Sequence, residues 1–152
     1  MSIAKDGVLP LTDNRMTRLM ISLEEGVELV WHAFKDMRGG EIYVKKIPSM
    51  KVTDIATAVD EKCKQEVVGI RPGEKLHEQM IGIEDALYTY EYPTHFKILP
   101  SINDWANDEV RIGNGIKVPK NFMYTSDNNK EWMEISELQE WIEKNKDKIG
   151  NI

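Results

Sequence analysis

A helical pattern of apolar residues begins after residue 22. Ser22 is a favourable N-cap residue, and Glu25 stands three residues later, which is the spacing of a capping box. Six apolar side chains then fall near one helical face: Leu23, Val27, Val30, Ala33, Phe34 and Met37. This periodicity predicts an amphipathic helix, and we expect Gly39 and Gly40 to end it.

Shorter elements alternate around this helix. Apolar and β-branched runs predict short strands at residues 8–11, 41–45 and 66–70. Thr53 is expected to cap a second helix, after a stiff loop at residues 47–50. A third, short helix is predicted over residues 75–81. Strands that alternate with helices in this way indicate an α/β fold.

The second half of the chain has a different pattern. Tyrosines alternate with other residues over 88–92, and an apolar run at 96–99 follows a Pro-Thr-His turn, so we predict a β-hairpin. Residues 103–119 and 121–129 are expected to form loops, because the first is interrupted by glycine and proline and the second is aromatic and polar. Ser136 is expected to cap the last helix.

Composition limits the class of protein. The 152 residues are 41% hydrophobic and 30% charged, which fits one globular domain over residues 1–152. The net charge of −6, without a basic block, disfavours a nucleic-acid partner. No apolar run approaches the roughly 20 residues that cross a bilayer, so no membrane partner is expected. The single cysteine, Cys63, forms no internal disulfide and fits a reduced, cytoplasmic location.

The sequence contains no recognisable catalytic centre of its own. Gly113-Asn114-Gly115 lacks the spacing of a dinucleotide-binding fingerprint. No cysteine and histidine cluster has zinc-binding spacing, and His32, His77 and His95 are scattered along the chain. We therefore expect no catalytic residue, no metal and no cofactor in this chain alone.

A charged turn follows the strand predicted at residues 66–70. Pro72-Gly73 forces a tight turn, from which Arg71 would project a planar guanidinium suited to a phosphate. The N-terminus of the helix predicted at 75–81 would add N–H donors, and the Glu74 carboxylate could accept two ribose hydroxyls. The alternative is a surface turn with solvated charges, and composition alone favours that alternative.

A second charged segment covers residues 12–18. Arg15 and Arg18 stand three residues apart beside short hydroxyl side chains, so they could clamp a diphosphate. A charged loop that precedes a helix is the alternative, and the residues alone do not decide between the two.

Four segments, in order along the chain, resemble motifs of the inverting UDP-N-acetylglucosamine 4,6-dehydratases. Leu11-Thr-Asp-Asn-Arg-Met-Thr-Arg18 resembles the family's Pro-Ile-Thr-Asp-x-Arg-Met-Thr-Arg. The other three are residues 39–51, residues 69–78 (Gly-Ile-Arg-Pro-Gly-Glu-Lys-Leu-His-Glu) and residues 124–132. One departure is Leu19-Met20, where the family pattern has Phe-Trp.

This resemblance implies the small C-terminal substrate-binding domain of an extended short-chain dehydrogenase/reductase, α/β in class, with its Rossmann half absent. The family-like core would cover residues 8–133, and a C-terminal helix would cover 136–147. In that family, NADP takes a hydride from C4 of the sugar, water leaves across C5–C6, and the hydride returns at C6. The product is a 4-keto-6-deoxy nucleotide sugar for surface glycans. Because the catalytic groups lie in the Rossmann half, the isolated chain is expected to be inactive.

The resemblance also assigns binding roles. It implies that Arg18 and Arg71 contact the UDP diphosphate, that Glu74 contacts the ribose, and that Met16 and Thr17 lie close to the nucleotide. The implied partners are a UDP-sugar, the missing Rossmann domain and, for the full-length protein, further copies in a homo-oligomer.

Two other interpretations stay open. The chain could be a non-catalytic interaction module, whose apolar surface covers a partner or a second copy. It could also be part of a related UDP-sugar 4-epimerase, since the segment at 71–75 would hold UDP in either enzyme. The segments at 12–18 and 124–132 favour the inverting dehydratase.

Overall fold

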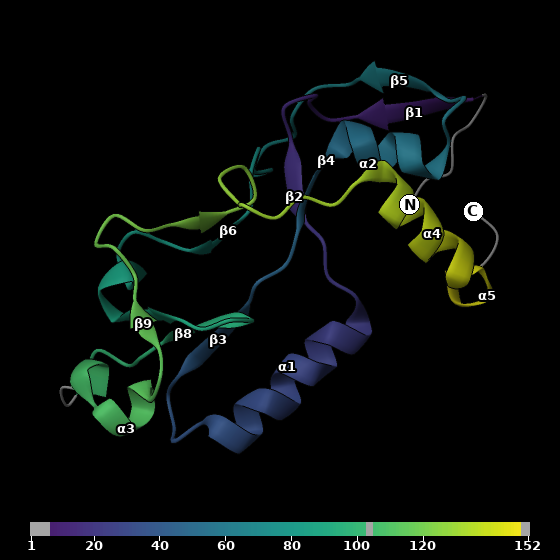
Figure 1. Ribbon diagram of the computed structural model, residues 1–152. Helices are drawn as coiled ribbons and strands as arrows, with labels where there is room; N and C mark the ends of the chain where they lie inside the picture. Colours follow the sequence, from purple (N-terminus) through teal and green to yellow (C-terminus); the bar gives the residue numbers. More distant parts are fainter. Residues whose placement is uncertain (1–6, 103–104, 150–152) are drawn as a thin grey trace. The chain divides into compact units, whose positions relative to one another are not determined.

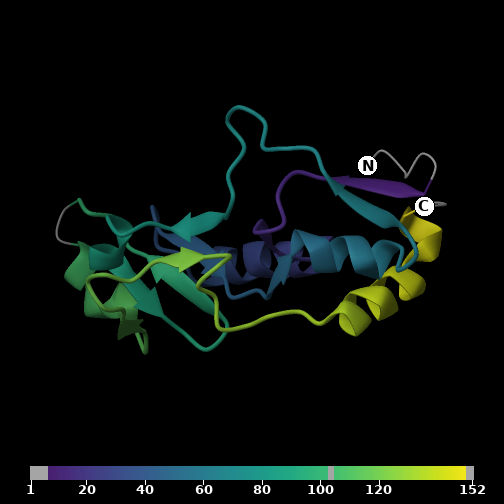
Figure 2. The same ribbon diagram turned by 90° about the horizontal axis from the view of Figure 1, so that it is seen from above.

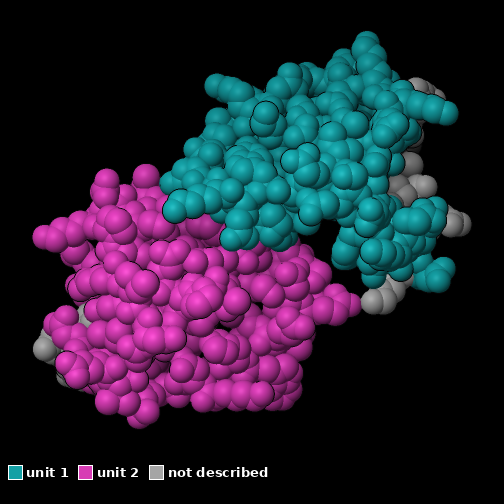
Figure 3. All heavy atoms as spheres, viewed as in Figure 1, with its two compact units in different colours: residues 1–20, 48–78, 126–152 teal, residues 21–47, 79–125 magenta. Residues whose placement is uncertain are grey.

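The computed structural model describes residues 7–102 and 105–149. Both ends of the domain expected over 1–152, and residues 103 and 104 of a predicted loop, lie outside the described residues. Contacts divide the chain into two compact units, which Figure 3 colours separately. Unit 1 comprises residues 1–20, 48–78 and 126–152, and unit 2 comprises residues 21–47 and 79–125.

Unit 1 contains paired short strands and two helices packed side by side (Figures 1 and 2). Its elements are β1 (Val8–Leu11), β2 (Thr17–Leu19), β4 (Ser49–Lys51), α2 (Val52–Val59), β5 (Lys64–Val67), α4 (Ile135–Lys144) and α5 (Lys146–Ile149). β1 pairs with β5 in parallel, and β2 pairs with β4 antiparallel. Between α2 and α4, Met50, Ala58 and Leu138 form a buried apolar core, against which Ile55 and Ile142 pack.

The helices of unit 1 begin close to their expected positions but with other caps. The expectation that Thr53 caps α2 is wrong, because Lys51 is the N-cap residue, two residues earlier, and it makes no side-chain cap hydrogen bond. The stiff loop expected at residues 47–50 includes the start of β4, whose backbone pairs with β2. Glu134, and not Ser136, caps α4. The helix expected over 136–147 is divided into α4 and α5.

Unit 2 contains an antiparallel sheet of order β3-β8-β7-β9. Its elements are α1 (Leu23–Asp36), β3 (Ile42–Lys45), β6 (Gln79–Ile81), η1 (Asp85–Tyr88), β7 (Thr89–Glu91), β8 (His95–Ile98), η2 (Trp105–Asn107), α3 (Glu109–Ile112), β9 (Ile116–Lys117) and β10 (Tyr124–Thr125). The hairpin of β7 and β8 confirms the prediction from the tyrosine pattern. The loops expected over 103–119 and 121–129 contain α3, β9 and β10. Tyr90, Tyr92 and Leu99 form a buried core with Ile112.

The predicted first helix is present, and its capping box is confirmed. Ser22 accepts a hydrogen bond from the Glu25 N–H, and the Glu25 carboxylate accepts one from the Ser22 N–H. The helix ends at Asp36, before Gly39 and Gly40, both of which have positive φ. Its apolar stripe is not buried: Leu23, Val27, Val30, Phe34 and Met37 are all exposed, with Leu23 82% accessible.

The short helix predicted over residues 75–81 is wrong. This stretch has turns followed by β6, which pairs with β10. Its backbone groups are bound by distant partners: the Leu76 carbonyl accepts from the Thr17 N–H, and the Glu78 carbonyl accepts from the Ser126 N–H. Helical hydrogen bonds would need those same carbonyls. The α/β class expected from the sequence is nevertheless confirmed by the helices and strands of both units.

Candidate functional site

The predicted nucleotide-binding residues of the charged segment at 12–18 lie on or beside β2 in unit 1. β2 pairs with β4, so that Arg18 lies opposite Met50. Met16 and Thr17 are buried, with 2% and 4% of their surface accessible. Both therefore stabilise the strand from inside, and the Arg18 side chain reaches its surface.

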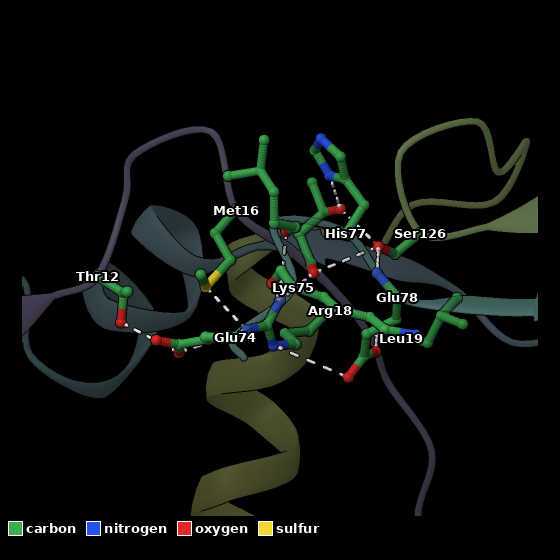
Figure 4. Close-up of polar contacts among 11 residues, drawn as sticks. Thr12, Met16, Arg18, Leu19, Glu74, Lys75, His77, Glu78 and Ser126 are labelled. Atoms are coloured by element: carbon green, nitrogen blue, oxygen red, sulfur yellow. Dashed lines mark hydrogen bonds and ion pairs between the residues drawn. The ribbon is translucent and has the colours of Figure 1, made fainter. Parts of the chain in front are cut away.

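Buried polar contacts hold β2 against the segment that ends at residue 78 (Figure 4). The Thr17 hydroxyl lies 2.8 Å from His77 Nδ1 and 2.6 Å from the Ser126 hydroxyl. Ser126 Oγ in turn accepts a hydrogen bond of 2.8 Å from the Glu78 N–H. Three segments that are distant in sequence are thus joined at one hydroxyl pair, which fixes the position of the strand that carries Arg18.

The Arg18 guanidinium is surrounded by acceptors (Figure 4). Nη1 donates to the Thr17 carbonyl at 2.7 Å and reaches the Leu76 carbonyl at 3.4 Å. Nη2 lies 3.9 Å from Glu74 Oε1, and Nε lies 3.8 Å from Glu78 Oε1. These two distances are ion-pair contacts longer than a hydrogen bond. Nη2 also donates to Met16 Sδ at 2.8 Å. Arg18 is therefore anchored by backbone carbonyls and by Met16, and it is only loosely held by the carboxylates.

Glu74 occupies the turn opposite Arg18. Its N–H donates to the Arg71 carbonyl at 3.1 Å, and Gly73 supplies the positive φ of 82° that the turn needs. One carboxylate oxygen accepts from the Thr12 hydroxyl at 3.3 Å, and the other accepts from the Arg71 N–H at 3.3 Å. The two charged segments singled out in the sequence therefore meet at the Arg18–Glu74 pair.

The Arg71 side chain is exposed on the same turn. Within the residues that the structure describes, its guanidinium makes no hydrogen bond or ion pair, and only its backbone contacts Glu74. No helix begins after this turn, so the helix N-terminus expected to add donors beside Arg71 is absent over residues 72–78. The guanidinium is thus available to a ligand without first breaking a contact.

Arg15, the other arginine of the charged segment at 12–18, is paired with Asp13. Its Nε and Nη2 donate to the two Asp13 carboxylate oxygens at 3.0 and 2.8 Å. Hydrogen bonds from Arg15 lower the pKa of the Asp13 carboxyl to about 2. This local pair removes Arg15 from the proposed diphosphate clamp, and the resemblance likewise assigned a diphosphate contact to Arg18 and not to Arg15.

Sequence reasoning did not identify Thr12, His77, Glu78 or Ser126 as part of this cluster. Glu78 accepts a hydrogen bond of 2.8 Å from the Leu19 N–H, which fixes its carboxylate beside β2. His77 and Glu78 belong to the motif at residues 69–78, so their closeness to Glu74 in the sequence could have identified them as neighbours of the site. Ser126 is 109 residues from its partner in sequence, and no local pattern marks such a contact.

Other features of the described residues place limits on the chemistry. Unit 2 has a cavity of about 250 Å³, lined by Glu28, Leu29, His32, Lys45, Thr94 and His95. Gly113-Asn114-Gly115 leads into β9 and not into a helix, so this segment does not fit a dinucleotide. In the described ranges, no group of three or more His, Cys, Asp or Glu side chains is arranged so that it could hold a metal ion. None of the helices described there is long and apolar enough to cross a membrane.

Comparisons with known proteins agree on one group of relatives. A family model described as polysaccharide biosynthesis protein matches residues 1–100. The chain is 47% identical to the UDP-N-acetylglucosamine 4,6-dehydratase (inverting) of Campylobacter jejuni, over 88% of this chain and 42% of that protein. It is 32% identical to a UDP-glucose 4-epimerase of Rickettsia akari, over 80% of this chain and 37% of that protein.

A solved structure is also similar. The X-ray structure of Pen from Bacillus thuringiensis matches with a TM-score of 0.72 and 26% identity. The match covers 93% of this chain and 41% of Pen. The chain therefore spans about two fifths of the length of the relatives that it matches.

Proposed function

The chain belongs to the polysaccharide biosynthesis protein family, and we propose that it is the UDP-sugar-binding C-terminal part of an inverting UDP-N-acetylglucosamine 4,6-dehydratase. The 47% identity to the Campylobacter enzyme supports the dehydratase over the epimerase, whose relative is 32% identical. The observation that carries the binding role is the meeting of Arg18 and Glu74, from separate charged segments, at a turn where the Arg71 backbone N–H also contacts Glu74.

In this proposal, the two arginines hold the diphosphate and Glu74 holds the ribose. Guanidinium groups suit phosphate oxygens because their N–H donors form a planar fork. An ionised carboxylate has only acceptors, which suits a ribose diol. Met16 and Thr17 are buried, so they act through the position of β2 and not by direct contact.

We assign the chemical step to the part of the related enzymes that this chain does not cover. We expect the full-length enzyme to use NADP and to convert the UDP-sugar to a 4-keto-6-deoxy product, as the resemblance implies. The Rossmann half would supply the cofactor site and the catalytic groups. On its own, the chain is expected to bind UDP weakly and to turn over no substrate.

Titration of the chain with UDP tests the proposal. A dissociation constant of about 1 mM is expected, because a partial site gives only about 4 kcal/mol of binding free energy. Arg71→Ala should weaken binding roughly ten-fold, since it removes charge-assisted hydrogen bonds to phosphate. Arg15→Ala is the matched control: it also removes one exposed arginine, but that arginine is paired with Asp13. Equal binding by Arg71→Ala and the unmodified chain would contradict the role of Arg71.

The exposed stripe of α1 favours a second candidate function, an interaction module. Leu23, Trp31 and Phe34 are each more than 60% accessible, although they lie on one 14-residue helix. Exposed apolar patches of this kind mark contact surfaces in many proteins. In this alternative, α1 binds a partner or a second copy, and the chain has no nucleotide affinity.

A further inference from the structure

We propose that Arg18 and Glu74 occupy each other in the free chain, and that a nucleoside diphosphate separates them and binds both. The diphosphate takes Arg18, and the ribose of the same molecule takes the released Glu74. This inference rests on the proposed function, because it concerns the same site. It adds that phosphate recognition and ribose recognition are coupled.

The contact between the two residues is weak enough to exchange. Arg18 Nη2 and Glu74 Oε1 are 3.9 Å apart, and the two side chains are 26% and 28% accessible. A hydrogen-bonded ion pair would be about 1 Å shorter. Partly exposed pairs of this kind contribute little free energy. A phosphate that approaches through solvent therefore competes against a loose contact.

Each residue keeps an anchor when the pair separates. Arg18 Nη1 donates to the Thr17 carbonyl at 2.7 Å, which holds the guanidinium beside β2. Glu74 Oε2 accepts from the Arg71 N–H, which holds the carboxylate at the turn. Nη2 also donates to Met16 Sδ at 2.8 Å, and Oε1 also accepts from the Thr12 hydroxyl at 3.3 Å. The contact between Nη2 and Oε1 can therefore open while each atom keeps another partner. The site therefore changes partners without rearrangement of its backbone.

Glu78, the other carboxylate near Arg18, does not take part in this exchange. Its Oε2 accepts a hydrogen bond of 2.8 Å from the Leu19 N–H, and its Oε1 lies 3.8 Å from Arg18 Nε. The Glu78 carboxylate is thus fixed to β2 with or without ligand. Glu74 is the carboxylate that competes with a phosphate for Nη2.

The exchange predicts that pyrophosphate and UDP respond differently to a change at Glu74. Inorganic pyrophosphate has to displace Glu74 and offers that carboxylate no new partner. UDP also displaces Glu74 from Arg18, but its ribose hydroxyls then donate to the Glu74 carboxylate, whose oxygens can each accept more than one hydrogen bond. Loss of the Glu74 charge should therefore help pyrophosphate and harm UDP. A purely structural role for Glu74 would weaken both ligands together.

NMR-detected titrations of Glu74→Gln with pyrophosphate and with UDP test this inference. Gln keeps an acceptor for the Arg71 N–H but removes the competing charge. Pyrophosphate is expected to bind to Glu74→Gln about two- to five-fold more tightly than to the unmodified chain. This factor corresponds to the free energy of an exposed ion pair. UDP is expected to bind roughly five-fold more weakly, because neutral acceptors form weaker hydrogen bonds than carboxylates.

Glu66→Gln is the matched control, because it changes the net charge equally from an exposed position on β5. It should leave both affinities unchanged. If Glu74→Gln leaves pyrophosphate binding unchanged or weakens it, the exchange is refuted, while UDP binding by the unmodified chain still supports the proposed function. If the unmodified chain binds neither ligand, the proposed function fails and the exchange fails with it.

Discussion

His95 is a buried imidazole in unit 2 whose charged form the fold disfavours. Only 6% of its surface is accessible, its ring stacks on Tyr92 at 4.6 Å, and the His32 ring lies 4.7 Å away. Its Nε2 has no hydrogen-bond partner among the described residues. Burial, together with the neighbouring positive charges of His32 and Lys97, lowers the pKa of His95 from 6.5 to about 4.

This low pKa predicts a loss of stability in mild acid. Between pH 6.5 and 4, the unfolded chain binds a proton at His95 and the folded chain does not, so the free energy of unfolding falls as the pH falls. The loss should reach at most about 3 kcal/mol at pH 4. Urea unfolding at several pH values measures it, with His95→Gln as the comparison. A variant with the same slope over this interval would exclude His95 as the cause.

At the scale of elements, α1 shows what a periodic pattern does and does not predict. Ser22, Glu25 and the apolar spacing correctly predicted a helix, because capping and periodicity are local properties. The same pattern does not say what the apolar face contacts. In the structure, the less exposed positions of α1 are Glu25, Gly26, Leu29 and Ala33, and the larger apolar side chains of the stripe are exposed.

We expect this exposed stripe to cause self-association of the isolated chain. Val27, Val30 and Phe34 are each at least 46% accessible, and burying them against a second copy removes apolar surface from water. Sedimentation equilibrium should show an average mass that rises with protein concentration. Phe34→Asp should remove the rise, because pairing would then bury a charge. Lys35→Asp, on the same helix outside the stripe, is the control and should still associate.

The outcome of this measurement also distinguishes the candidate functions. A chain that stays monomeric at every concentration would contradict the stripe as a self-contact surface. Association that survives Phe34→Asp would place the contact elsewhere. Association without UDP binding would favour the interaction module over the dehydratase part.

The segment at residues 69–81 shows which features neighbouring residues predict and which they do not. The Pro72-Gly73 turn was predicted correctly, since turn chemistry depends on neighbouring residues. The helix after the turn was wrong, because Thr17 and Ser126 bind the backbone at Leu76 and Glu78. Such tertiary hydrogen bonds override a weak local preference for helix.

At the scale of the whole molecule, motif resemblance selected residues that lie close together in the structure, and periodicity did not. Arg18 and Glu74 were assigned to one nucleotide, and the structure brings their side chains within 3.9 Å. The buried hydroxyl contact between Thr17 and Ser126 was not predicted, although it fixes the strand that carries Arg18. Charged residues in a known motif are visible in a sequence, whereas contacts between distant segments require the fold.

The two compact units raise the question of whether the chain unfolds as the single domain expected over residues 1–152. Each unit has its own apolar core, with Met50 and Leu138 in unit 1 and Tyr90 and Leu99 in unit 2. Separate cores predict separate local stabilities, because a cavity in one core removes contacts only there. We therefore expect the two units to respond differently to a core substitution.

Leu138→Ala tests this expectation. Leu138 is 7% accessible, and its truncation should cost about 3 kcal/mol in unit 1. Amide hydrogen exchange should accelerate in β2 and β4, while β8 of unit 2 keeps its protection. Leu99→Ala, at a site that is 2% accessible, is the reciprocal variant and should accelerate exchange in unit 2 alone. Equal acceleration in both units by either variant would instead support one cooperative domain, in which the proposed nucleotide site shares its stability with every element of the chain.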